Sequence, residues 1–328
     1  MPIKLTSYYR GSVLPMLPGN DTFHSTTLFH LYEETPGCYP VLLVVSDGDE
    51  VLGKLLAVVQ RIVRFLPFYA IRRCVSYGPG EFFCADHQRE EVFKLLMSEL
   101  TSYANRMDCF VVEVRNLPQA LTGFAIFKQN NYFPVNWMRV RNSLSVEGKI
   151  EQTFSPSRRR QIRRALKNGA ETMSIHTKAE ITEFTEMLKR NYSYKIRKHF
   201  PNDKFFSLMK DYLVEGRLSK IFVTKLHEKI IGGCVCIYSG DTAFVWFSGG
   251  MNKTHILQSP TVIAIWTALT DAQQRGYRYL EFLDVGTPFR KHGYRDFVLR
   301  FGGEQISTRR WFHFRWKWLN QLCVSFYS

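Results

Sequence analysis

The amino-acid sequence predicts the same order of elements twice, and this duplication restricts the fold more than any other feature. Each copy reads as a β-hairpin, a third strand that stops at glycines, a helix and a final strand. The first copy has these elements at 41–46, 51–60, 75–77, 88–107 and 109–114. The second copy has them at 220–226, 230–238, 242–248, 259–276 and 279–285. We therefore expect an α/β protein with mixed sheets, built from two similar domains.

The domain boundary is predicted near residue 150, which gives a first domain over 1–150 and a second over 151–328. The tail over 309–328 alternates aromatic and basic side chains with the period of two that is typical of a strand. We expect the tail to complete a sheet, with its aromatic face buried, and to pack back on the first domain. An interfacial role at a membrane is the alternative, because Trp beside Arg and Lys suits the lipid headgroup region.

Composition places the chain among globular proteins. It has 328 residues, of which 45% are hydrophobic, and no apolar run approaches the roughly 20 residues that cross a bilayer. The first ten residues have no apolar core of a signal peptide, so a cytoplasmic location is expected. Seven scattered cysteines indicate reduced, mostly buried thiols. Cys234 and Cys236 alternate along one predicted strand and have no second pair, so no metal site is expected.

The positive charge is concentrated in the second half. Residues 1–150 hold 15 Lys and Arg against 14 Asp and Glu, whereas residues 151–328 hold 29 against 15. Such an imbalance favours an anionic partner for the second domain, such as a nucleotide, a tRNA, coenzyme A or an acidic membrane surface. A basic surface that only contacts solvent is the alternative.

A short basic helix is predicted between Ser155, as its N-cap, and Gly169, as its left-handed stop, with Pro156 in the first helical position. At 100° per residue its cationic side is formed by Arg159, Arg160, Arg163 and Lys167. Its packing side is formed by Ile162, Ala165 and Leu166. Repulsion between neighbouring cations favours a phosphate or membrane facing this helix, and a solvated face is the alternative.

Ordered motifs along nearly the whole chain resemble the Fem family of peptidoglycan-bridge aminoacyl transferases and the wider group of tandem GNAT-like acyltransferases. They are Phe23-His24-Ser25, Tyr77-Gly78-Pro79, Glu113-Val114-Arg115, the basic helix at 157–169, Leu283-Asp284-Val285-Gly286 and Phe297 to Phe301-Gly302-Gly303. The resemblance implies two GNAT-like domains and transfer of an acyl or aminoacyl group to an amine. The chain departs from the family at Phe297-Val298, where members often have Phe-Lys.

Attack of an amine on an ester or thioester needs juxtaposed substrates, donors to the oxyanion and removal of a proton. Glu113 and Asp284 end corresponding strands and are candidate bases, or structural carboxylates paired with a neighbour. Arg295 and Arg300 are candidates to replace the electrostatic part of the missing lysine, or ordinary surface arginines. Tyr294 is a candidate oxyanion donor, or a packing residue.

Substrate binding is expected at the family motifs near the start, at the basic helix and at a basic, aromatic segment before Pro201. The candidates are His24, Ser25, Tyr77, Arg159, Arg163, Lys167, Lys195 and Arg197. Arg197 is the leading candidate for a diphosphate contact, because a guanidinium binds phosphate in a forked geometry. A solvated helix end is the alternative.

No tightly bound cofactor is expected, and acyl-CoA or aminoacyl-tRNA would be a co-substrate. The chain has no GNAT pyrophosphate loop. Its nearest counterpart is Met251–Ser259, where free N–H groups at a helix start are predicted to hold an anion. The leading hypothesis is amide formation on an amine of a peptidoglycan or other cell-envelope precursor, with peripheral contact to the inner membrane surface and no DNA partner. The rivals are an acyl-CoA-dependent N-acetyltransferase of a small molecule or sugar amine, and a non-catalytic protein that binds RNA or a membrane surface.

Overall fold

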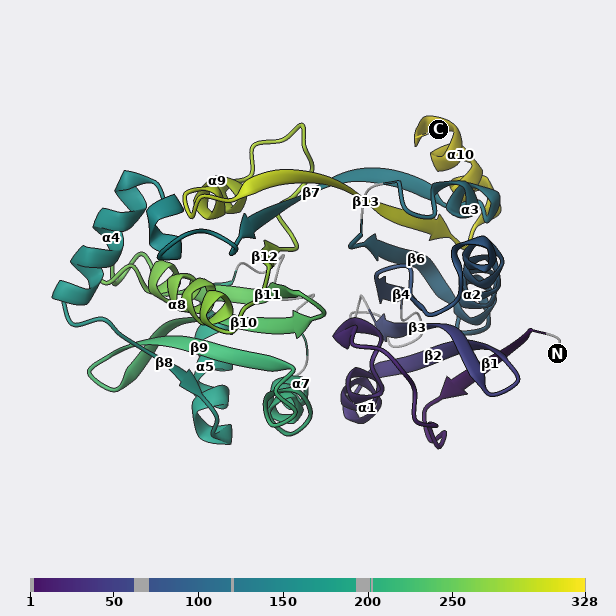
Figure 1. Cartoon of the computed structure of the whole chain (residues 1–328), viewed down its shortest axis with the longest axis horizontal. Helices are drawn as coiled ribbons and strands as arrows, with labels where there is room; N and C mark the ends of the chain where they lie inside the picture. Colours follow the sequence, from purple (N-terminus) through teal and green to yellow (C-terminus); the bar gives the residue numbers. More distant parts are fainter. Residues whose placement is uncertain (1–2, 62–70, 119–120, 193–200, 202, 328) are drawn as a thin grey trace. The chain divides into compact units, whose positions relative to one another are not determined.

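The computed structural model describes residues 3–61, 71–118, 121–192, 201 and 203–327. The chain forms two compact units (Figure 1). Unit 1 contains Met1–Trp137 and Ser307–Ser328, and unit 2 contains Met138–Ile306. The units therefore divide inside a strand at Trp137, and the tail belongs with the first half of the sequence.

Unit 1 is a sheet with a helix on each face. Its elements are β1 (Lys4–Tyr9), a 3-10 turn (Thr22–His24), α1 (Thr26–Glu34), β2 (Cys38–Asp47), β3 (Glu50–Arg61), β4 (Arg72–Tyr77), β5 (Glu81–Phe82), α2 (Asp86–Arg106), β6 (Cys109–Asn116), α3 (Phe124–Gln129), part of β13 (Glu304–Phe314) and α10 (Lys317–Tyr327). The strand order is β1-β2-β3-β4-β6-β13, with β5 beside β3. The predicted hairpin is β2 and β3, and α2 connects the parallel strands β4 and β6.

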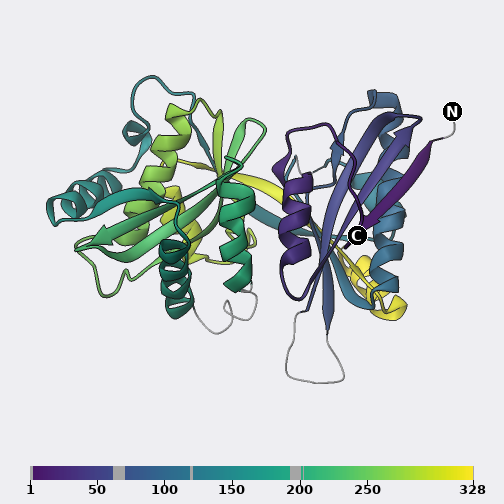
Figure 2. The ribbon, with the colours of Figure 1, turned by 90° about the horizontal axis from the view of Figure 1, so that it is seen from below.

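Alternating side chains explain why both faces of the unit 1 sheet are covered (Figure 2). On β2, Val41, Leu43 and Val45 join the core under α2. The intervening Leu42 and Val44 are also buried, on the face that α1 covers. Strands buried on both sides read as continuous apolar runs, which is what the sequence shows at 41–45.

Unit 2 repeats this arrangement with more helices. Its elements are β7 (Phe133–Ser143), a 3-10 turn (Ile150–Thr153), α4 (Pro156–Lys167), β8 (Glu171–Ile175), α5 (Lys178–Asn191), α7 (Asp203–Met209), a π-helical segment (Lys210–Val214), β9 (Ser219–Leu226), β10 (Lys229–Ser239), β11 (Thr242–Gly250), α8 (Pro260–Gln274), β12 (Tyr279–Phe282) and α9 (Gly293–Leu299). The strand order is β7-β12-β11-β10-β9-β8. The mixed α/β architecture is thus confirmed in both halves.

Glycines bring helices close to the unit 2 sheet. A Cβ at Gly232 would lie 2.5 Å from Cβ of Pro260 in α8, and a Cβ at Gly233 would lie 2.6 Å from Phe184 in α5. Adjacent strand residues point to opposite faces, so α8 and α5 cover opposite sides of β10. Gly249 and Gly250, predicted to end a strand, instead lie within β11 and pair with Gly233 and Gly232. Their small size serves packing here rather than a chain break.

Each unit receives one strand from the other half of the sequence. In unit 1, β13 pairs with β6 in antiparallel register, with Arg310 opposite Arg115. In unit 2, β7 pairs with β12 in the same sense, with Arg141 opposite Glu281. Both strands follow the final strand of their own copy, so the duplication predicts where they occur. It does not predict which strand they join.

The basic helix is confirmed as α4, with the Ser155 hydroxyl accepting from the N–H of Arg158 and Gly169 at φ +76°. The helix predicted at 259–276 is confirmed as α8, which begins at Pro260 and has no side-chain cap from Ser259. Two predictions about faces are wrong. Leu166 is exposed, while Arg158 is buried. The tail is a strand only as far as Phe314 and then becomes the helix α10, whose aromatic side chains are exposed rather than buried.

None of the helices in the described part of the chain combines the length and the apolar character needed to cross a membrane.

Candidate functional site

Unit 2 contains a point where two parallel strands separate. β11 and β12 are paired only over 242–245 and 279–282. Beyond that, β11 continues to Gly250, whereas the chain after β12 stays beside β7, with the N–H of Met138 donating to the carbonyl of Gly286 at 2.9 Å. The carboxyl ends of separated parallel strands are where open α/β sheets place functional groups.

Three hydroxyl side chains meet at this separation. The Tyr294 hydroxyl, from α9, lies 2.8 Å from Oγ of Ser248 on β11, and the Tyr192 hydroxyl donates to the backbone carbonyl of Ser248 at 2.7 Å. Burial raises the pKa of Tyr192 to about 12 and that of Tyr294 still further from its ordinary value. Both phenols therefore keep their protons at neutral pH, so each has an O–H available to donate.

Asp284 lies in the loop between β12 and α9, and Arg295 lies in the first turn of α9. The Asp284 side chain is exposed, and its charge adds to the burial that raises the pKa of Tyr294. The buried guanidinium of Arg295 donates to the backbone carbonyls of Thr287 at 2.8 Å and Arg290 at 2.6 Å. Arg295 thus fixes the loop, which makes it a positioning residue for Tyr294 next to it in α9.

His292 was missed by the sequence analysis, although it lies two residues before Tyr294. Its Nδ1 atom is buried and has no hydrogen-bond partner among the described residues. Its ring lies against Gly286, where a Cβ would come within 2.6 Å of Cδ2 and where φ is +81°. The glycine after Asp284-Val285 is the local signal, since it makes room for a ring beside the strand end.

Arg300 and Val298 do not join this group. Arg300 is exposed at the C-cap of α9, the end away from Tyr294, and its carbonyl accepts from the N–H of Ser155. Val298 is fully buried in the unit 2 core. The position where family members often have lysine therefore cannot present a charged group to a substrate in this chain.

Arg158 is a second buried cation of this region, in addition to Arg295. Its guanidinium lies over the rings of Phe297 and Phe301, 4.4 and 4.3 Å from their centroids, and donates to the carbonyl of Phe297. Burial, with a contribution from Arg300, lowers the pKa of Arg158 to about 10. This side chain connects α4 to α9, a role that its place in a run of arginines does not indicate.

Lysine at position 298 is expected to unfold unit 2 locally rather than restore a family feature. Val298→Lys should lower the free energy of unfolding by about 3 kcal/mol or more, because it places an ammonium group in an apolar core. Thermal and urea unfolding of the purified variant measure this. Asp296→Lys, exposed on the same helix, should cost less than about 1 kcal/mol. Equal stability of Val298→Lys and the unmodified protein would contradict the burial of this position.

Unit 1 places Glu113 among three arginines. Its carboxylate lies 2.9 Å from Nε of Arg115, 3.1 Å from Nη1 of Arg310 and 3.8 Å from Nη1 of Arg73. Burial alone would raise the pKa of Glu113, but these cations outweigh it and lower the pKa to about 2. A carboxylate held this firmly in its charged form is a poor proton acceptor, so the structure favours the paired, structural reading of Glu113.

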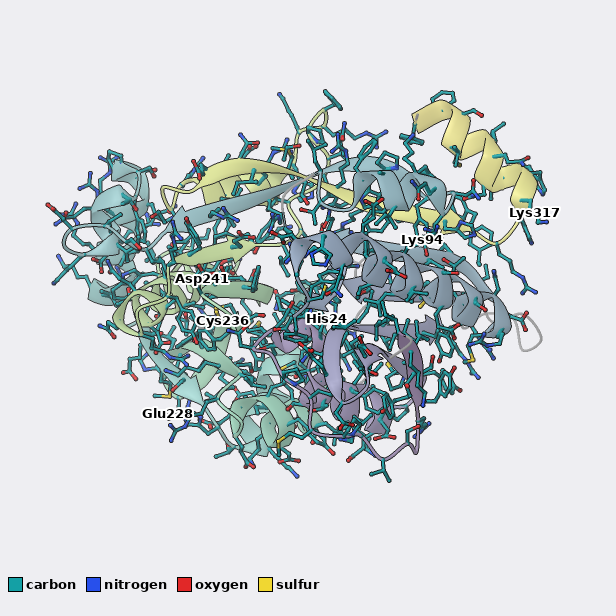
Figure 3. All side chains as sticks on the ribbon, turned by 45° about the vertical axis from the view of Figure 1, so that its right-hand side comes forward. His24, Lys94, Glu228, Cys236, Asp241 and Lys317 are labelled. Carbon is teal, nitrogen blue, oxygen red and sulfur yellow. The ribbon has the colours of Figure 1, made fainter. Side chains whose placement is uncertain are left out.

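The three family-motif residues of unit 1 lie around one strand end. Tyr77 accepts a hydrogen bond from Nη1 of Arg115 at 2.9 Å and stacks on Phe23. His24, labelled in Figure 3, is fully buried, and its Nδ1 accepts from the N–H of Leu56 at 3.0 Å. Burial lowers the pKa of His24, so the ring is neutral with its proton on Nε2, beside Gly78.

Ser25 has a structural task. Its hydroxyl accepts from the N–H of Leu28 as the N-cap of α1 and donates to the carbonyl of Thr22 at 2.8 Å. These bonds fix the turn that carries His24.

The duplicated strand in unit 2 has its own arginine-bound carboxylate. Glu281 on β12 is buried and pairs with Arg139 and with Arg141, whose Nε donates at 2.6 Å. Glu281 thus occupies the place of Glu113 in the second copy, rather than Asp284 as the sequence analysis paired them. In unit 2 both arginines lie on β7, the strand from the other half of the sequence, whereas in unit 1 only Arg310 lies on such a strand, β13.

The cationic side of α4 is exposed. Arg159, Arg163 and Lys167 reach solvent, and none of the ion pairs found in the described residues includes them. Lys195 and Arg197 fall outside the described residues, so their predicted role stays a prediction. The exposed cations of α4 remain available to an anion.

The start of α8 differs from the prediction for a GNAT pyrophosphate site. Pro260 has no N–H, and the N–H of Thr261 donates to Oδ1 of Asn252 at 3.2 Å. The N–H groups of Val262 and Ile263 donate to the carbonyl of Ser259. The first N–H groups of this helix are therefore occupied from within the chain, so the predicted anion site at this helix start is wrong.

The comparisons with known proteins agree with this architecture. Residues 156–291 match the family model described as acetyltransferase (GNAT) domain. The structure of FemX is similar with a TM-score of 0.66 at 14% identity, over 93% of this chain and 95% of that one. A tandem GNAT protein from the clavulanic acid biosynthesis pathway is similar with a TM-score of 0.54 at 13% identity, over 95% and 98%.

A third similar structure is the C-terminal domain of a putative lysylphosphatidylglycerol synthetase from Agrobacterium fabrum, with a TM-score of 0.50 at 10% identity over 82% and 84% of the two chains. No curated protein sequence matches the chain. Unit 2 thus contains the match to a GNAT domain, and the chain as a whole has a fold similar to that of a tandem GNAT protein. Within that class its architecture is Fem-like, since FemX is similar along nearly the whole of both chains.

Proposed function

We propose that this protein transfers an acyl or aminoacyl group from an activated carrier to an amine, with the reaction in unit 2. The observation that carries the proposal is the pair of hydroxyls of Tyr294 and Ser248 at the separation of β11 and β12. In a GNAT fold this is a place for a carbonyl to lie between two strands. The GNAT domain match over 156–291 supports the same reaction type.

The chemistry requires no metal and few residues. The amine nitrogen attacks the carbonyl carbon, a C–N bond forms, and the C–O or C–S bond to the carrier breaks. Tyr294 is proposed to donate its O–H to the oxygen that becomes negative, since burial keeps this phenol protonated. His292, with its unpartnered Nδ1, is proposed to accept the proton that the amine loses and to return it to the departing oxygen or sulfur, so that the carrier leaves as an alcohol or thiol.

The donor that fits best is an aminoacyl-tRNA. The first N–H groups of α8 are occupied internally, which disfavours a coenzyme A pyrophosphate at this helix start. The exposed cations of α4 are suited to phosphates of an RNA or of a nucleotide-linked precursor. The Fem resemblance favours an amine of a peptidoglycan or other cell-envelope precursor as the acceptor, with the reaction in the cytoplasm.

The decisive experiment incubates the purified chain with charged tRNAs or acyl-CoAs and a panel of muropeptides. Mass spectrometry should detect a new amide with at least one aminoacyl-tRNA and should detect none after ribonuclease treatment of the donor. No product with any donor would count against a transferase. Product from acyl-CoA alone would support the transferase proposal but would show that the donor is an acyl-CoA rather than an aminoacyl-tRNA.

An acyl-CoA-dependent N-acetyltransferase is the second candidate. The description of the matching family model favours it, because it names acetyl transfer. Calorimetry should then show coenzyme A binding without any tRNA. A non-catalytic RNA- or membrane-binding protein is the third candidate, favoured by the exposed cations of α4, and turnover that requires Tyr294 would exclude it.

A further inference from the structure

The helix α10 of unit 1 presents apolar side chains to solvent. Trp318, Leu322 and Phe326 follow one another at intervals of four residues, so they form one ridge along the helix. Their exposed fractions are 65%, 62% and 85%. Trp316, just before the helix, is also exposed and stacks on Trp318 with ring centroids 6.2 Å apart.

The inward side of α10 carries the helix's one fully buried residue in the described range, and this residue is polar. The side-chain oxygen of Asn320 accepts from the N–H of Phe314 at 2.8 Å, and its amide nitrogen donates to the carbonyl of Asn131 at 2.8 Å. The helix is therefore attached to unit 1 through these hydrogen bonds and through Tyr327, which stacks on Phe133, while Trp318, Leu322 and Phe326 face outward. A helix made only to cover a protein core has the opposite arrangement.

The cation beside this ridge is Lys317. The sequence has no Asp or Glu after Glu304, and the neighbouring Arg310 and Arg315 are already paired with Glu113 and Asp108. Lys317, labelled in Figure 3 at the start of α10, is exposed beside the two tryptophans. Tryptophan flanked by lysine is typical of segments that lie at the boundary between lipid headgroups and acyl chains.

We propose that α10 is a docking surface for an anionic lipid membrane. Trp318, Leu322 and Phe326 enter the upper acyl region while Lys317 remains at the level of the phosphates. The helix lies along the surface, because eleven residues are too short to cross a bilayer. A second copy of this chain is disfavoured as the occupant, since Lys317 beside one ridge would meet Lys317 beside the other.

Co-sedimentation with vesicles tests this docking surface directly, with the full chain and no substrate. The unmodified protein should bind vesicles of mixed phosphatidylglycerol and phosphatidylcholine more tightly than vesicles of phosphatidylcholine alone. Phe326→Ser and Leu322→Ser should each weaken binding about tenfold or more, through lost burial of an apolar side chain. Lys317→Gln should weaken binding about fivefold on the anionic vesicles only.

The matched control is Phe289→Ser, which removes an equally exposed phenylalanine (89%) from a loop of unit 2. It should bind vesicles as the unmodified protein does, and all variants should keep the same thermal unfolding midpoint because the side chains are exposed. Failure of the unmodified protein to bind either vesicle overturns the proposal. So does a concentration-dependent dimer in sedimentation that Phe326→Ser abolishes, because a second copy would then cover the ridge.

Discussion

Tyr294→Phe is expected to lower the rate of amide formation about 100- to 1000-fold while leaving the fold intact. The substitution removes only the hydroxyl that lies 2.8 Å from Oγ of Ser248, and loss of one preorganised donor to an oxyanion costs a factor of this size. The Km values should change little, because the lost interaction belongs to the transition state. Single-turnover kinetics with the donor found active is the measurement.

A matched control for Tyr294 is Tyr277→Phe. Tyr277 is also a unit 2 tyrosine, stacked on Tyr238 away from the separation of β11 and β12. The rate of amide formation by Tyr277→Phe should stay within about twofold of that of the unmodified protein, because the activation free energy is then almost unchanged. Equal rates for both variants would remove Tyr294 from the reaction. A loss confined to Km would make Tyr294 a substrate-binding residue instead.

Glu113→Gln is expected to lower the free energy of unfolding of unit 1 by about 3 kcal/mol or more. The neutral amide keeps the shape but leaves the charges of Arg73, Arg115 and Arg310 without the carboxylate they share. Urea unfolding followed by tryptophan fluorescence measures the loss. Glu99→Gln, which breaks a surface pair with Arg106, should cost less than about 1 kcal/mol.

The pH dependence of stability separates this effect from simple loss of packing. Glu113 has a pKa of about 2 in the folded chain, below the value of about 4.3 in an unfolded one. Its contribution is therefore fully present above about pH 4.3 and is lost as the pH falls toward 2. The difference in stability between the unmodified protein and Glu113→Gln should shrink over that window. If this difference in stability stays constant over that pH window, the charge of Glu113 does not cause the stabilisation.

Local sequence patterns predicted the elements because each pattern has a local physical cause. The apolar run at 41–45 predicts a strand buried on both faces, and Ser155, Pro156 and Gly169 delimit a helix through capping, a fixed φ and a left-handed residue. The prediction of a strand through the tail is wrong, because the alternation of aromatic and basic side chains in Phe312–Trp318 continues past Phe314, where the strand ends.

The candidate site was predicted in part. Tyr294 lies at the separated strands, whereas Val298 is in the core and Arg295 holds a loop. Ser248 and His292 have no motif of their own. Ser248 sits 46 residues from Tyr294 in the sequence and meets it only because β11 and α9 are packed in one unit.

The sequence by itself determined the duplication, the order of the elements within each copy, and the concentration of positive charge in residues 151–328, because these depend on local periodicity, capping and composition. Only the tertiary structure decided that β13 joins β6 and that β7 joins β12, since strand pairing depends on partners distant in sequence. The same pairing brings Arg310 to Glu113, where it joins Arg115 in lowering the pKa of that carboxylate. Whether a carboxylate can accept a proton in catalysis or serves only as a structural ion-pair partner depends on its neighbours in space.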